Sequence, residues 1–181
     1  MAEAQTQLVP FSELTSGQAG AIRNDVIRRL LSIAVRELKV GVDNLVVRDI
    51  RAKEDLILYS KGAAVDVEDW GCVTGTTADA YETMAADTMA TDRWMAFFGV
   101  TVNPDCPCTA LKFHVGGGDR VIWQLQALRE DDDFTGLCPS GVVIPQSIPY
   151  TISRFVRVAS SPAVIILKGI VVERRGKVVS P

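Results

Sequence analysis

Residues 120–128 read RVIWQLQAL, and their pattern decides the class of the fold. Two sets of side chains alternate along this stretch: Trp123, Leu125 and Ala127 in one set, and Ile122, Gln124 and Gln126 in the other. Successive side chains of a β-strand point to opposite faces of the sheet. An apolar set that alternates with a set carrying two glutamines therefore predicts a strand with one core face and one wet face.

Other runs rich in β-branched and aromatic residues lie on both sides of this one, and we expect them to be strands as well: 94–102, 108–115, 142–144, 150–158 and 164–173. The three glycines at 116–118 allow a hairpin, and the prolines at 145, 149 and 162 mark strand ends. The pattern predicts a mainly β protein in which residues 93–181 form an antiparallel β-sandwich, jelly-roll-like, as one unit.

One amphipathic helix is predicted upstream, over residues 21–38. Val26, Leu30 and Ala34 recur every four residues, and Gly41 is a plausible end. A strand should follow at 44–50, whereas residues 51–58 fit a short helix and an extended crossing equally well.

The rest of residues 1–92 is expected to be irregular. Residues 1–20 are typical of an arm, and residues 60–92 of a long loop with one short helix around 81–89. The arm has no regular element in which to bury its sizeable apolar side chains, so we expect them to bind a partner: Leu8, Val9, Phe11 and Leu14. An ordered loop of this length is also an interface candidate.

Composition narrows the function classes. The chain has 181 residues, is 48% hydrophobic and carries a net charge of −3, so nothing favours general binding of nucleic acid. Its longest apolar stretches, such as 163–167, are far shorter than the roughly 20 residues of a membrane helix. The first five residues lack the features of an export signal. We expect neither a nucleic-acid partner nor a membrane.

No metal or cofactor is expected. The four cysteines, Cys72, Cys106, Cys108 and Cys138, are interpreted as reduced thiols, because the lone C-x-C pair lacks the spacing of a zinc site. The acidic run at 130–133 lacks the spacing of a calcium loop. The glycines at 116–118 lead into a strand, unlike a phosphate-binding loop.

We also expect that the protein is not an enzyme. His114 is the only histidine and lies inside a predicted strand, with no partner indicated by the sequence. The enzyme alternative would rely on Cys108, His114 and a carboxylate that the sequence does not identify.

Two basic groups could face an acidic protein partner. One consists of Arg23, Arg28 and Arg29 on the helix, and the other contains Arg174 and Arg175 near the C-terminus. No aromatic residues interleave with them to stack nucleic-acid bases.

Four segments resemble the accessory capsid proteins of tailed bacteriophages, the cement or decoration proteins with a β-sandwich body: 94–100, 120–128, 143–152 and 165–177. The resemblance implies a structural virion protein, made in the host cytoplasm, that binds the major capsid protein of the same virus. It also implies a homo-oligomer, with a trimer favoured. The helix at 21–38 departs from the smallest such proteins, which leaves a head-tail or tail assembly component as an alternative.

A carbohydrate- or ligand-binding β-sandwich module is the other alternative, since tryptophans can supply stacking faces. Trp123 and Trp94 are expected in the core. Trp70, next to Gly71 in the predicted loop, is the candidate for an exposed binding residue.

Overall fold

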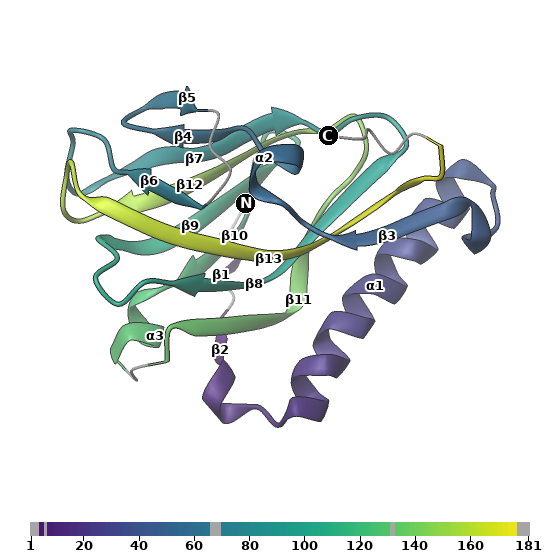
Figure 1. Ribbon diagram of the computed structural model, residues 1–181, viewed down its shortest axis with the longest axis horizontal. Coiled ribbons are helices and arrows are strands. Elements are labelled where there is room, and N and C mark those ends of the chain that lie inside the picture. Colours follow the sequence, from purple (N-terminus) through teal and green to yellow (C-terminus); the bar gives the residue numbers. More distant parts are fainter. Residues whose placement is uncertain (1–3, 6, 66–69, 131–132, 177–181) are drawn as a thin grey trace.

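The computed structural model describes residues 4–5, 7–65, 70–130 and 133–176, which form two sheets packed face to face and a long helix on one of them (Figure 1). The helices are α1 (Ser16–Leu38), α2 (Ala52–Asp55) and α3 (Gln126–Glu130), with 3-10 turns η1 (Phe11–Glu13) and η2 (Val42–Asn44). The strands are β1 (Ala4–Gln5), β2 (Val9–Pro10), β3 (Leu45–Asp49), β4 (Leu58–Ser60), β5 (Ala63–Val65), β6 (Gly71–Val73), β7 (Ala80–Thr88), β8 (Arg93–Val102), β9 (Cys108–Val115), β10 (Gly118–Gln124), β11 (Thr135–Ile144), β12 (Pro149–Val156) and β13 (Pro162–Arg174).

Eight of these strands have the order of a jelly roll. One sheet contains β3-β13-β8-β11 and the other β7-β12-β9-β10, with every neighbour antiparallel. Numbered along the chain from β3, these orders are 1-8-3-6 and 2-7-4-5, the pairing of two Greek keys in a double-sheet jelly roll. The predicted antiparallel β-sandwich is therefore confirmed.

Short strands extend both sheets at their edges. β1 pairs with β10 and β2 with β11, so the N-terminal segment lies along the last strand of each sheet. β4 and β5 continue the other sheet edge beyond β7. Strands from residues 1–92 thus belong to both sheets, and the boundary expected at residue 92 does not coincide with a break in either sheet.

The main core lies between the sheets and contains a row of aromatic rings. The ring centroids of Phe97 and Phe113 are 5.7 Å apart, and those of Phe113 and Trp123 are 4.6 Å apart. Trp123 is fully buried in this core, as the alternation predicts, and Trp94 is fully buried in the apolar layer under α1. Neither tryptophan offers a face to a ligand.

The helix α1 forms a second apolar layer on the outer face of β8, β11 and β13. Its stripe of Val26, Leu30 and Ala34 is buried, as predicted. The helix begins at Ser16, five residues before the expected start, because Thr15 and Gln18 form a capping box that overrides the glycines of the first turns. It ends at Leu38, as predicted, and the left-handed residue that caps it is Lys39 and not Gly41.

The prediction of a long loop over residues 60–92 is wrong. The segment contains β5, β6 and the nine-residue β7, which replaces the short helix expected around 81–89. Thr83 pairs with Ser153 and Ala85 with Ile152, so Met84 is an extra residue in the ladder. This bulge breaks the alternation that would have identified the strand.

Two smaller differences concern strand ends. Residues 51–58, whose sequence fits a short helix and an extended crossing equally well, contain the short helix α2 and the start of β4. The run at 120–128 leaves the sheet after Gln124 and continues as α3. In the part of the chain that the structure describes, no helix combines the length and apolar character needed to cross a membrane.

Candidate functional site

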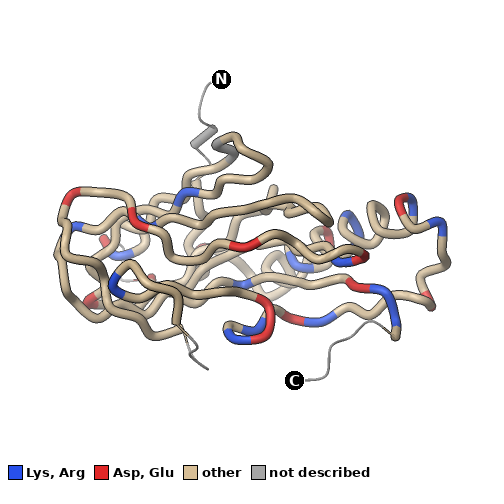
Figure 2. Tube along the Cα trace, turned by 90° about the horizontal axis from the view of Figure 1, so that it is seen from above, with Lys and Arg blue, Asp and Glu red and all other residues tan. Residues whose placement is uncertain are grey.

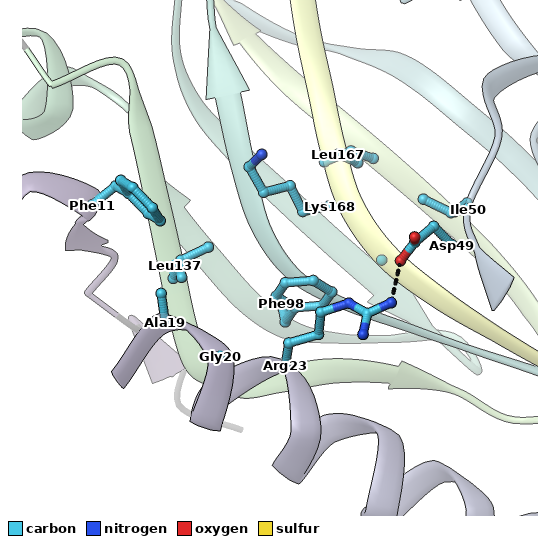
Figure 3. A pocket seen from close by; sticks show the side chains of 11 residues that line it. Phe11, Ala19, Gly20, Arg23, Asp49, Ile50, Phe98, Leu137, Leu167 and Lys168 are labelled. Carbon is cyan, nitrogen blue, oxygen red and sulfur yellow. Dashed lines mark hydrogen bonds and ion pairs between the residues drawn. The ribbon is translucent and has the colours of Figure 1, made fainter. Parts of the chain in front are cut away.

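A groove lies between the first turns of α1 and the outer face of the sheet that this helix covers (Figure 3). Its volume is about 450 Å³. The side chains of Phe98 and Leu137 supply an apolar lining, while Ala19 and Gly20 form the helix side. The groove is thus built from β8, β11, β13 and α1, which are far apart in the sequence.

A bulge in β8 places Phe98 against this groove. Gly99 pairs with Lys168 and Phe97 with Gly169, so Phe98 has no opposite residue on β13. Phe97 enters the core between the sheets, whereas Phe98 packs with the apolar layer under α1. An extra residue of this kind re-aims the side chain beside it.

Two glycines allow the close approach of strands at the bulge. A Cβ on Gly99 would lie 2.6 Å from Leu137 Cδ2 and 2.7 Å from the Gly136 carbonyl oxygen. A Cβ on Gly169 would lie 2.9 Å from the Ala96 carbonyl oxygen. These distances leave no space for a side chain, so both positions require glycine.

The rim of the groove carries more positive than negative charge. Arg23 Nη2 donates to Asp49 Oδ1 at 2.9 Å, but the side chains are 43% and 71% exposed. Such an exposed pair contributes little to stability. Lys168 adds a second cation and extends toward the Phe11 side (Figure 3). One carboxylate and two cations favour an anionic group beside an apolar one.

Of the four arm residues predicted to bind a partner, three contact the protein's own fold and one lies at the groove. Leu8 is buried in the protein's own core, which removes it from the set available to a partner. Val9 pairs with Leu137, and Leu14 packs against the apolar layer under α1. Phe11 is 47% exposed and lines the groove. Only Phe11 of the four predicted residues thus combines exposure with a place at this site.

Asp133 fastens the arm. Ser12 N donates to Asp133 Oδ2 at 2.5 Å, and Thr135 N donates to Oδ1 at 3.2 Å. Partial burial raises the pKa of Asp133, but the hydrogen bonds from Ser12, Thr135 and Phe11 outweigh it and hold that pKa below its usual range. The ionised carboxylate is therefore the form that holds the arm.

The other predicted partner residues lie elsewhere. Trp70 is only half exposed and packs against the main core. Arg174 and Arg175 are exposed at the end of β13, six or more residues from Lys168. At about 3.3 Å per residue, this places them about 20 Å from the groove. The structure does not join them with Phe11 into one site.

The cysteine and histidine of the enzyme alternative do not meet. Cys108 is buried in the main core, and His114 is half-buried six residues further along β9, again about 20 Å away. Among the described residues no group of three or more His, Cys, Asp or Glu side chains could hold a metal ion.

Sequence reasoning missed a buried ionic cluster. Arg48 forms ion pairs with Asp55, at 2.6 Å, and with Glu173, at 3.0 Å. Arg93 forms an ion pair with Glu173 at 2.8 Å. Two cations thus balance two buried carboxylates from α2 and β13. The cluster fixes α2 against the end of the sheet, and the side chains come from segments whose pairing no local pattern predicts.

Comparison with known proteins yields little. No family model and no curated protein matches the chain. Among solved structures, the nucleoplasmin-like N-terminal domain of Drosophila FKBP39 is similar, with 9% identity, a TM-score of 0.29 and coverage of 61% of this chain and 92% of that chain. A similarity of this size carries no argument about function.

Proposed function

We propose that this protein is a non-enzymatic structural component of a virus particle that binds the major capsid protein of the same virus and reinforces the shell. The groove under α1 carries the proposal. Its apolar lining, its exposed Phe11 and its two cations suit an apolar segment of the capsid protein that bears a carboxylate.

The surroundings of the groove support binding to a large partner. Val164 and Ile166 of β13 are 36% and 37% exposed and precede Lys168 on the same strand. Alternate residues of a strand share a face, so the three side chains point the same way. Apolar surface next to a groove is typical of interaction sites. The jelly roll occurs in viral capsid proteins but also in lectins and cupins, so the fold alone does not decide the function.

We propose further that the protein acts as a homo-oligomer, with a trimer favoured. A repeating shell offers many equivalent sites, and linked subunits gain about 10² to 10⁴ in avidity without any new type of contact. Light scattering after size exclusion tests this. A trimeric mass is expected, and a strictly monomeric mass at tens of micromolar contradicts it.

A glycine in α1 offers a sharp test of the groove. Gly20 lines it, and a Cβ at this position would meet no atom within 4 Å. Gly20→Leu should therefore fill the groove without a clash, while removing a glycine from a helix interior stabilises the helix by up to about 1 kcal/mol. We expect a folded protein whose dissociation constant for capsid particles rises at least about tenfold, or about 1.4 kcal/mol.

The matched control is Gly17→Leu, because Gly17 lies in the same helix but does not line the groove. Cosedimentation of each full-length variant with particles of the source virus measures binding. Equal binding by both variants removes the groove from the mechanism. No binding of the unaltered protein to any part of the particle removes the virion proposal, and binding to connectors or tails alone favours the head-tail or tail assembly alternative.

The carbohydrate-binding alternative loses its tryptophans. Trp94 and Trp123 are fully buried, and Trp70 packs on the core. Tyr81, which is exposed like Phe11, lies on the other sheet, where it contacts Phe155 edge to face at 5.1 Å and has Lys112 over its ring. Two side chains of the protein itself therefore already contact this ring.

A further inference from the structure

The groove under α1 contains one charge that its surroundings do not balance. Arg23 and Asp49 form an ion pair at the rim, so their charges offset one another. Lys168 is half-buried at the groove, and its ammonium group points away from that pair (Figure 3). Within the part of the chain that the structure describes, no carboxylate forms an ion pair with Lys168. A partly buried cation in this situation favours a bound anion.

The strand next to Lys168 leaves space for such an anion. Lys168 pairs with Gly99 of β8, and side chains at paired positions point to the same face of a sheet. Gly99 has no side chain, and the contacts that a Cβ would make with Leu137 and the Gly136 carbonyl oxygen keep it that way. No side chain of β8 therefore covers the groove side of Lys168.

The rest of the groove suits an apolar body of limited length. Phe98 and Leu137 provide the apolar lining, and Phe11 is exposed beside them. From Lys168 on β13 the groove crosses β8 to β11, and two strand spacings of this kind cover about 10 Å, the length of an alkyl chain of about eight carbon atoms. The volume of about 450 Å³ is typical of sites for small molecules.

The backbone below the groove favours an alkyl chain over a peptide. β8 lies between β11 and β13, and β13 lies between β8 and β3, so the backbone groups of both strands are paired within the sheet. A peptide lying along this lining would bring backbone groups that find no partners there, at a cost in free energy. An alkyl chain brings no polar groups into the lining.

We propose that the groove binds a free apolar monocarboxylate of the medium-chain fatty acid class, with its carboxylate at Lys168 and its alkyl chain against Phe98. The ligand occupies the place proposed for the capsid segment, so it regulates attachment to the shell by competition. The regulation rests on the proposed function, whereas the ligand site rests on the groove alone. Lys168 selects the anionic head group.

NMR titration of the full-length protein with sodium octanoate tests the ligand site. Octanol, which lacks the charge, and octylamine, which carries the opposite charge, are the comparison probes. We expect the dissociation constant of octanoate to be at least about tenfold lower than that of octanol, and octylamine to bind more weakly still. Equal affinity for octanoate and octanol overturns the proposal, as does the absence of octanoate binding at millimolar concentration.

Two substitutions of lysine by methionine locate the charge. Lys168→Met keeps much of the side-chain volume and should weaken octanoate binding at least about tenfold while octanol binding stays the same. Lys112→Met is the matched control, because Lys112 is half-buried on the other sheet, and it should leave octanoate binding unaltered. Equal losses in both variants, or no loss in either, overturn the role of Lys168. Circular dichroism verifies that both variants are folded.

A variant that fills the groove tests the place of the alkyl chain. Gly20→Leu should weaken the binding of octanoate and of octanol alike, because a side chain at this position enters the groove without a clash. Gly17→Leu, in the same helix but outside the groove, should bind both probes as the unaltered protein does. Unchanged binding in Gly20→Leu overturns the location of the ligand.

Cosedimentation with particles of the source virus separates the ligand site from the proposed function. Saturating octanoate, but not octanol at the same concentration, should displace most of the protein from the particles. Octanoate that binds without displacing the protein overturns the regulation and leaves the ligand site standing. Binding of octanoate by a protein that binds no particle overturns the virion proposal alone, and binding to particles by a protein that does not bind octanoate overturns the ligand site alone.

Discussion

The two sheets of the sandwich meet water differently. Nearly every residue of β8, in the sheet under α1, is buried, since Met95 and Phe97 face the core while Trp94 and Ala96 face the helix. On β9, in the other sheet, Lys112 and His114 alternate with buried residues and remain half exposed. We call these the covered sheet and the open sheet. A strand that is apolar on both faces therefore indicates that a further layer covers its sheet.

The two sheets also differ in what covers their aromatic residues. The view from above shows charged residues on the long helix α1 and scattered singly along the rest of the chain (Figure 2). On the open sheet, Lys112 and Arg157 lie over the rings of Tyr81 and Phe155. The open sheet thus covers its exposed aromatic residues with flexible cations, whereas the covered sheet uses a helix.

We expect the largest loss of stability when the contact between α1 and the covered sheet is broken. Leu30→Asp places an unpaired carboxylate at a fully buried position, which should lower the free energy of unfolding by about 3–5 kcal/mol. Chemical denaturation followed by circular dichroism measures it. Ser32→Asp, on the exposed side of α1, is the control and should change stability by less than about 1 kcal/mol. Equal small effects would show that the stripe is not buried.

A smaller loss of stability is expected for a glycine on the covered sheet, in comparison with a glycine on the open sheet. Gly99→Ala forces a Cβ within 2.7 Å of the Gly136 carbonyl oxygen on the covered sheet, at an expected cost of about 1–3 kcal/mol. Gly118→Ala on the open sheet meets no atom within 4 Å and should be nearly neutral. Thermal unfolding of both variants gives the comparison. A neutral Gly99→Ala would mean that β8 and β11 can separate at no cost.

A smaller, pH-dependent change of stability is expected where Asp133 holds the arm. Because the pKa of Asp133 is lower in the folded protein, its ionised form stabilises the fold at neutral pH. That contribution is complete above the ordinary aspartate pKa, near 4, and is lost as the pH falls through the lower folded value. Asp133→Asn should cost about 1 kcal/mol at pH 7 and show no such loss in acid. Identical acid denaturation curves would contradict the role of Asp133.

The smallest effect is expected on the open sheet. Lys112→Met removes the cation over Tyr81 but keeps much of the side-chain volume, and should change stability by less than about 1 kcal/mol. Denaturant unfolding measures this change against the unaltered protein. A loss of several kcal/mol would show that the open sheet depends on its cations as the covered sheet depends on α1.

Local patterns predicted much of this fold, and long-range contacts explain what they missed. The stripe of α1 follows from residue periodicity. The ends of β9 follow from a run rich in β-branched and aromatic residues that stops at the glycines 116–118. The strand β7 was missed because the bulge at Met84 puts two buried residues in succession. The start of α1 was missed because the capping box at Thr15 outweighs two glycines that resemble a loop.

The site was harder to predict than the fold. Phe11 was identified as a partner-binding residue because it lacked a regular element, and the structure does place it at the groove. Its companions Phe98 and Lys168 were not identified, since each belongs to a strand whose role depends on a bulge.

The strand pairings also set the order in which the chain can fold. β3, the first strand of the jelly roll, pairs with β13, the last, and Val9 pairs with Leu137. During synthesis these early segments must remain without their partners until most of the chain has left the ribosome. Contacts between such distant residues slow the search for the native state. Newly made chains should therefore expose unpaired β-edges for longer than a helical protein of this size, and depend on chaperones during that interval.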